Sequence, residues 1–229
     1  MLEKIPEKQR LQVKEITLDL AGNMGLIARK CFPAASQVID RFHVQQLASE
    51  ALQEIRIKHR WEAIDAENQA IEKARQSKTE HHQEVLSNGE TLKQLLARGR
   101  YLLYKSESKW TIEQANRAFL LFERYPEIEK AYRLTQELSW IFNTTKDKLY
   151  GFARLAKWNE KVEKSGLKAF NTISKTLINH HQNILNYFEN RSTNASAESF
   201  NAKIKSFRAQ YRGVGDINFF LFRLAKLFA

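Results

Sequence analysis

Apolar residues recur at steps of three and four along most of the chain, which is the spacing of a helix with one buried side. From Phe42 onward this pattern is almost continuous, and it is interrupted by polar segments and by Pro126. We therefore expect helices over residues 44–75, 92–104, 111–125, 127–143, 153–163, 167–188, 191–213 and 217–228. Trp61, Trp110, Trp140 and Trp158 are expected in their core. This part of the chain predicts a mostly α-helical protein.

The first 40 residues show a different pattern. Apolar and polar residues alternate in 13–20, and a second short β-type run covers 36–39. The segment 24–32 between them is predicted to be a helix that buries Leu26, Ile27 and Cys31. A strand–helix–strand order implies two parallel strands. Two strands do not make a stable sheet alone, so we expect further strands from upstream sequence or from another chain.

The predicted helix 191–213 has two distinct faces. Ala197, Phe200, Ile204, Phe207 and Tyr211 form an apolar stripe that is expected to face a core. One position further on runs a polar row, made of Glu198, Asn201, Lys205, Arg208 and Arg212. Glu198 is the only acid between Asn190 and Asp216. It either complements the helix dipole or binds a metal ion at the head of a phosphate-facing row of cations.

Charge and composition narrow the function classes. The 229 residues carry a net charge of +11, and the isoelectric point is near 9.7, which favours a polyanionic partner such as nucleic acid. The only cysteine, Cys31, excludes an internal disulfide or cysteine zinc site and favours the cytoplasm. No segment has the length of a membrane span, so no membrane partner is expected. The sequence has no P-loop, glycine-rich dinucleotide turn or serine nucleophile elbow, which argues against kinases, dehydrogenases and such hydrolases.

Two aspartates end the predicted strands. Asp19 and Asp40 should meet at one edge, because ligand sites of parallel sheets lie off the carboxyl ends of the strands. Carboxylates there suit Mg²⁺, and a pair of such ions can cleave a phosphodiester. The simpler alternative is a turn former or a helix N-cap, especially for Asp40. His43, three residues later, either binds the same metal or hydrogen-bonds to Asp40. The other histidines are predicted to be solvated: His59, His81, His82, His180 and His181.

Three segments carry a resemblance to a known family: LDLAGNM, FPAASQVIDRFHV and TNASAESFNAKIK. Together they resemble the C-terminal part of a bacterial insertion-sequence transposase of the Asp-Asp-Glu class. The resemblance implies a partial ribonuclease H-like fold, with a short parallel βαβ unit at the N-terminus and a large all-helical insertion. The implied boundaries are 1–44 for the βαβ unit, 45–188 for the insertion and 189–229 for the helices that carry the glutamate.

The resemblance also implies roles. Glu198 matches the family's glutamate and Asp19 best matches its second aspartate, so these two would hold Mg²⁺ or Mn²⁺, while Asp40 and His43 match an Asp-x-x-His string beside the site. Asp40 remains an alternative to Asp19 as metal ligand. The residues expected to contact DNA are Asn201, Lys203, Lys205, Arg208 and Arg212. The implied partners are transposon ends, target DNA, and a second copy or an upstream transposase fragment.

One departure from the family is expected to matter. The family's first aspartate lies on an earlier strand, and residues 1–12 contain no aspartate. We therefore expect a partial transposase that is inactive alone in the metal-dependent cleavage and transfer of DNA strands. The alternative is a non-catalytic, basic helical protein that binds nucleic acid or regulates transposition.

Overall fold

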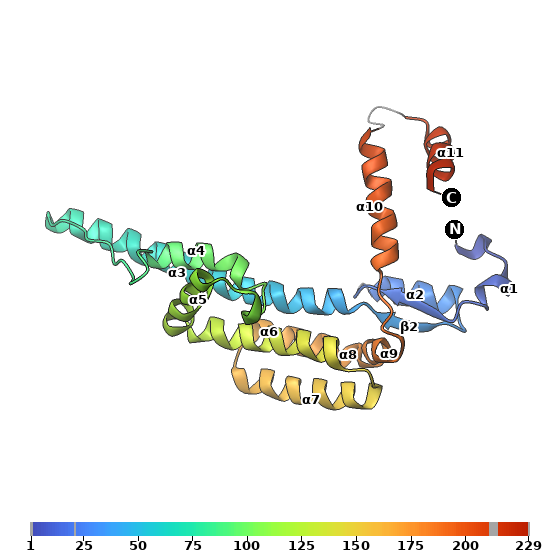
Figure 1. The fold of residues 1–229 in the computed structure, drawn as a ribbon, viewed down its shortest axis with the longest axis horizontal. Coiled ribbons are helices and arrows are strands. Elements are labelled where there is room, and N and C mark those ends of the chain that lie inside the picture. Colours follow the sequence, from blue (N-terminus) through green and yellow to red (C-terminus); the bar gives the residue numbers. More distant parts are fainter. Residues whose placement is uncertain (1, 21, 211–214, 229) are drawn as a thin grey trace. The chain divides into compact units, whose positions relative to one another are not determined.

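The computed structural model describes residues 2–20, 22–210 and 215–228. It confirms a mostly α-helical fold with a short β unit near the N-terminus (Figure 1). The chain forms two compact units, Met1–Arg191 and Ser192–Ala229, and each is described by itself. The ribonuclease H-like fold and the boundaries at 44/45 and 188/189 remain predictions.

The N-terminal part contains the expected strand–helix–strand unit. A 3₁₀ turn (Leu2–Lys4) and a short helix, α1 (Glu7–Arg10), precede strand β1 (Glu15–Leu18), helix α2 (Gly22–Cys31) and strand β2 (Ser36–Ile39). The strands are parallel, and Leu18 is in register with Ile39. The predicted burial of Leu26 and Ile27 is wrong, since these side chains are 61% and 44% exposed. The buried residues of α2 are Ala28 and Cys31. Because these two form the inner side of the helix, Leu26 and Ile27 lie on its outer side.

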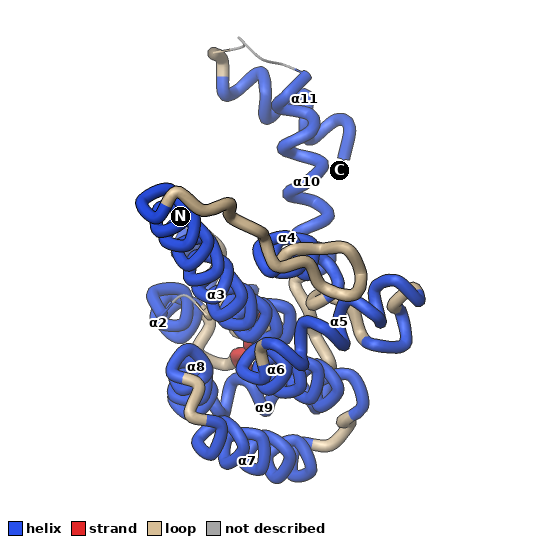
Figure 2. The backbone as a smooth tube through the Cα atoms, turned by 90° about the vertical axis from the view of Figure 1, so that its left-hand side faces the viewer, coloured by secondary structure: helices blue, strands red, loops and turns tan. Residues whose placement is uncertain are grey.

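The first unit is built around one long helix, α3 (Arg41–Ser77). Its first half buries Val44, Ala48 and Leu52 in the core. Helices α4 (Leu92–Leu102), α6 (Pro126–Thr144) and α8 (Lys168–Asn179) pack against it, and Figure 2 shows them around its axis. The second half of α3 extends beyond α6 and α8 (Figure 1).

Local signals in the sequence fix where most helices begin. Thr91 and Thr111 form capping boxes at α4 and at α5 (Ile112–Arg124). Pro126 occupies the first turn of α6, where its missing N–H is not needed. Asp147 caps α7 (Lys148–Ser165). A 3₁₀ turn (Glu107–Lys109) separates α4 from α5. These helices agree with the expected ones to within a few residues, except that α7 begins five residues earlier than expected.

The single helix expected over 167–188 is wrong. The segment forms two helices, α8 and α9 (His181–Asn190), because the backbone of His180 leaves the helical region. Leu177 and Ile184 are nevertheless both buried, each from its own helix. The break allows α8 to pack against α3 while α9 packs against β2.

Aromatic residues fill much of the core. The Trp158 side chain is 0% exposed, and its Nε1–H donates a hydrogen bond to the carbonyl oxygen of Leu134 at 2.9 Å. Phe142 stacks on Phe188 with ring centroids 5.4 Å apart. The expectation that all tryptophans lie in the core is wrong for Trp61 and Trp140, which are 60% and 51% exposed.

The second unit contains α10 (Ala195–Gln210) and α11 (Ile217–Phe228). Phe207 is 5% exposed, and its ring lies 5.4 Å from that of Phe220 on α11. Phe200, which the apolar stripe also placed inward, is 45% exposed. The prediction is therefore wrong for Phe200. Tyr211 lies outside the described residues.

Candidate functional site

The two strand-ending aspartates lie side by side at one edge of the sheet. The backbone N–H of Asp40 donates a hydrogen bond to the carbonyl oxygen of Leu18 at 2.9 Å. Asp19 directly follows Leu18, so parallel pairing brings both carboxylates to the carboxyl edge of β1 and β2. Asp19 is exposed, whereas Asp40 is only 2% exposed.

Asp40 is the N-cap of α3. Its Oδ1 accepts a hydrogen bond from the backbone N–H of Phe42 at 2.9 Å, and its carbonyl oxygen accepts one from the N–H of His43 at 3.2 Å. A buried carboxylate at this end of a helix is stabilised by the cap and by the helix dipole. The capping alternative is therefore correct for Asp40, and a metal-binding role in addition remains a prediction.

His43 lies in the first turn of α3, directly after the cap. Its ring is half-buried and meets the ring of Phe42 edge-on, with centroids 5.9 Å apart. The hydrogen bond from its backbone N–H holds the backbone of His43 next to Asp40. A role for the His43 imidazole in metal binding, or in a side-chain hydrogen bond to Asp40, stays a prediction.

Glu198 lies in the first turn of α10, in the second unit. Its N–H donates to the carbonyl oxygen of Asn194 at 2.8 Å, and its side chain is exposed. Asn201, Lys205 and Arg208 follow it at steps of three and four, and all three are exposed. Lys203 is exposed on another side of the helix. Arg212 lies outside the described residues.

The sheet edge offers oxygen donors of the kind that a divalent cation requires. Carboxylate oxygens are the ligands that Mg²⁺ prefers, and Mg²⁺ usually takes only one or two of them beside water and phosphate. Asp19 and Asp40 fit that requirement, although Oδ1 of Asp40 already accepts the cap hydrogen bond. Within residues 2–20, 22–210 and 215–228, no three His, Cys, Asp or Glu side chains group closely enough to hold a metal ion.

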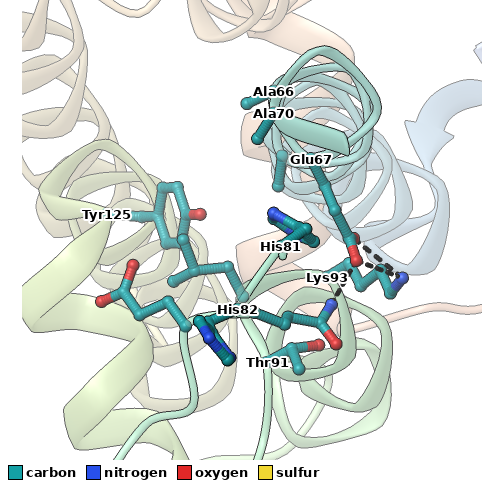
Figure 3. Close-up of a pocket in the computed structure, with 12 residues that line it drawn as sticks. Ala66, Glu67, Ala70, His81, His82, Thr91, Lys93 and Tyr125 are labelled. Carbon is teal, nitrogen blue, oxygen red and sulfur yellow. Dashed lines mark hydrogen bonds and ion pairs between the residues drawn. The ribbon is translucent and has the colours of Figure 1, made fainter. Parts of the chain in front are cut away.

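A separate pocket of about 420 Å³ lies between the second half of α3, the start of α4 and the connection between them (Figure 3). Glu67 in its wall forms an ion pair with Lys93 at 2.8 Å, and burial raises the pKa of Tyr125. The Nε2 atom of His81 is buried there without a hydrogen-bond partner. The prediction that His81 is solvated is thus wrong for this atom. No signal in the sequence marked these residues as one pocket.

His59 is also less exposed than predicted. Its Nδ1 lies 2.9 Å from Glu62, its Nε2 lies 2.8 Å from Glu127, and the side chain is 15% exposed. The ring also packs against Tyr125, with centroids 5.0 Å apart. The imidazole joins α3 to α6, which residue spacing along one helix could not reveal.

A family model described as transposase, DDE_Tnp_ISL3, matches residues 1–224. The chain belongs to this transposase family. No curated protein and no solved structure matches the chain. As a transposase it has DNA as its partner, and transposases of the Asp-Asp-Glu class generally use a divalent metal ion. None of the described helices of the transposase combines the length and the hydropathy needed to cross a bilayer.

Proposed function

We propose that this transposase is inactive alone and that, once a polypeptide supplies the family's first aspartate, it cleaves DNA strands at transposon ends and transfers them to target DNA in the cytoplasm, with Asp19 and Glu198 as ligands of Mg²⁺ or Mn²⁺. The observation that carries the proposal is the pairing of β1 and β2. It brings the exposed carboxylate of Asp19 and the buried carboxylate of Asp40, which caps α3, to the carboxyl edge of parallel strands. Ligand sites of such sheets lie at this edge.

The reaction consists of two phosphodiester substitutions. In the first, water attacks a phosphorus atom at the transposon end, the P–O3′ bond breaks, and a 3′-hydroxyl is released. In the second, that 3′-hydroxyl attacks a target phosphodiester, so that one P–O bond forms and one breaks. A divalent cation held by Asp19 and Glu198 would supply Lewis-acid chemistry, which favours loss of the proton from the attacking oxygen and neutralises charge on the leaving oxygen.

The residues of the chain have distinct tasks in this scheme. The exposed carboxylates of Asp19 and Glu198 would hold the metal ion. Asp40 positions the start of α3 through its cap, and His43 lines the same edge. Asp40 stays the alternative to Asp19 as metal ligand.

The polar row of α10 binds DNA in this proposal. Asn201, Lys205 and Arg208 are exposed on one side of the helix, and Lys203 adds a cation on another side. Phosphate contacts of this kind position a duplex without reading its sequence. Arg212 continues the row in the sequence.

The test is cleavage of an end-labelled duplex that carries the transposon end. The full chain is mixed with a polypeptide that carries the family's first aspartate, and Mg²⁺ or Mn²⁺ is added. We expect nicked product with the wild type and none with Asp19→Asn or Glu198→Gln, while both variants still bind DNA. The matched control is Glu163→Gln, which changes an exposed acid of α7.

Two results would count against this proposal. Cleavage by Glu198→Gln at the wild-type rate would remove Glu198 from the site. DNA binding without metal-dependent cleavage in every combination would favour the non-catalytic alternative, a basic helical protein that regulates transposition.

A further inference from the structure

The pocket between α3, α4 and their connection takes no part in the proposed cleavage of DNA. We call it the α3–α4 pocket. Its volume of about 420 Å³ lies in the range of small-molecule sites, about 300–1,000 Å³. Such sites usually have apolar walls and a few polar groups that fix the orientation of the ligand. The walls and the polar groups of this pocket therefore indicate which kind of molecule it can hold.

One wall of the α3–α4 pocket is made of small apolar residues. Ala63, Ala66 and Ala70 follow one another at steps of three and four on α3. Figure 3 shows the ring of Tyr125 across the pocket from Ala66 and Ala70. The Tyr125 ring is held from behind by the ring of His59, with centroids 5.0 Å apart. A space between small side chains and an aromatic ring suits a planar molecule, whose faces can contact both sides.

Two polar groups of the pocket have no hydrogen-bond partner within the part of the chain that the structure describes. The Nε2 atom of His81 is buried and unpaired. The hydroxyl of Tyr125 also makes no hydrogen bond there, and Figure 3 shows it pointing toward the side of the pocket that carries His81. An imidazole nitrogen or a hydroxyl can donate or accept. Because an unpaired buried polar atom is costly, a bound group that pairs with it would be stabilised.

The charged residues of the pocket are already paired. Glu67 forms an ion pair with Lys93 at 2.8 Å and accepts a hydrogen bond from Gln83. Glu84 forms an ion pair with Arg124 at 2.7 Å. These pairs leave no charge in the pocket for a phosphate or an ammonium group to neutralise. The pocket therefore favours a neutral ligand.

We propose that the α3–α4 pocket binds a nucleobase-type ring, which is a neutral and planar heterocycle. The edge of such a ring carries donors and acceptors side by side, which match the imidazole of His81 and the hydroxyl of Tyr125, and its faces stack on aromatic side chains. The ring belongs either to a free nucleoside or to an unpaired base of a nucleic acid. The inference does not depend on the proposed cleavage of DNA.

The first test is saturation-transfer NMR of the full chain with adenosine, guanosine, cytidine and thymidine, and with ribose as the control probe. Nucleoside concentrations up to about 5 mM cover dissociation constants in the millimolar range. We expect transfer to the base protons of at least one nucleoside and none to free ribose. No transfer to any nucleoside, or equal transfer to ribose, overturns the proposal.

The second test narrows the pocket. Ala66→Leu places a larger side chain on its helical wall and keeps a good helix former, so it should weaken nucleoside binding at least about tenfold. The matched control is Ala156→Leu, which places the same side chain in a different apolar pocket, lined by residues of α7, α8 and α9. Far-ultraviolet circular dichroism checks that both variants are folded. Unchanged binding by Ala66→Leu, or equal weakening by both substitutions, overturns the proposal.

The third test removes the unpaired polar groups. His81→Phe keeps an aromatic ring but removes Nε2, and it should weaken binding about two- to tenfold, the value of one hydrogen bond. It should not lower the free energy of unfolding, because the atom that it removes has no partner. Tyr125→Phe should weaken binding by a similar factor, whereas the control Tyr150→Phe, at an exposed tyrosine of α7, should not. Unchanged binding by both His81→Phe and Tyr125→Phe overturns the proposal.

A fourth test distinguishes the two sources of the ring. A duplex with one unpaired nucleotide is added to the complex with the bound nucleoside, and a fully paired duplex is the control. Displacement by the unpaired nucleotide alone assigns the pocket to a base of a nucleic acid, whereas displacement by neither duplex assigns it to a free molecule. Equal displacement by both duplexes overturns the recognition of a single ring.

Discussion

The helical bundle of α3 to α9 and the residues assigned to chemistry differ in how their side chains are held. In the bundle, Trp158 and Phe188 are 0% exposed, and Glu90 is hydrogen-bonded to several partners. Among the candidate site residues, by contrast, Asp19 and Glu198 are exposed. Stability therefore resides in the bundle, whereas the proposed chemistry belongs to exposed residues that DNA and metal would cover. The predictions below test that division, from the largest expected effect to the smallest.

The centre of the bundle should give the largest loss of stability. Trp158→Ala empties a fully buried site and leaves the Leu134 carbonyl without its donor. We expect a decrease in the free energy of unfolding of about 3–5 kcal/mol, measured by urea denaturation. The matched Trp140→Ala should cost about 1 kcal/mol, because its indole is half exposed and stacks mainly with Arg154. Equal losses would contradict a core centred on Trp158.

The Glu90 cluster should give the next largest effect, and this effect depends on pH. Burial raises the pKa of the Glu90 carboxyl, but hydrogen bonds from Arg117 and Arg98 outweigh it and hold this pKa below its usual 4.5. Because the folded pKa is lowered, the stabilisation is complete above the unfolded value and is lost as pH falls through the folded one.

Glu90→Gln should therefore lower the free energy of unfolding by about 2–3 kcal/mol at pH 7. The difference from the wild type should shrink below about pH 4.5, where the unfolded carboxyl becomes protonated. Urea denaturation at pH 7, 5, 4 and 3 measures it. Glu163→Gln, on the exposed side of α7, is the control and should show no such trend. A difference that stays constant with pH would mean that the charge of Glu90 does not matter.

The helical bundle and the candidate site also differ in how much of each could be predicted from the sequence. Apolar spacing located the helices of the bundle, and the caps at Thr91 and Thr111 located two of their starts, because these signals lie within a few residues of one another. The break at His180 was missed because Leu177 and Ile184 keep helical spacing across it. What separates α8 from α9 is that they pack against different partners, α3 and β2.

The candidate site was predictable to a smaller extent. The adjacency of Asp19 and Asp40 follows from the order of the elements, since a βαβ unit has parallel strands. The exposure of Leu26 depends on which side of α2 packs against the core, and the link from His59 to Glu127 joins two helices that are far apart in the sequence. Periodicity carries no information about such contacts.

Substitutions at Asp40 can distinguish its role as the N-cap of α3 from a role as a metal ligand. Asp40→Ala removes the acceptor for the Phe42 N–H and should lower the free energy of unfolding by about 1 kcal/mol. Asp40→Asn keeps an acceptor oxygen and should cost less than half as much. If Asp40 is only a cap, Asp40→Asn also keeps metal-dependent cleavage, whereas a loss of cleavage with unchanged stability would make Asp40 the metal ligand in place of Asp19. Asp19→Asn, at an exposed position, should change stability by less than about 0.5 kcal/mol.

The smallest expected effect concerns the cations of α10, which are exposed and so contribute little to folding. Lys205→Ala should leave the urea midpoint unchanged but reduce the slope of log Kobs for DNA against log salt by about 0.9, the value for one phosphate contact. The measurement is fluorescence anisotropy with a labelled duplex at several salt concentrations. The matched control is Lys130→Ala on α6, an exposed lysine of the bundle. An unchanged slope for Lys205→Ala would place DNA on another surface and leave the basic row of α10 without its proposed role, since a cation that releases no counterion makes no phosphate contact.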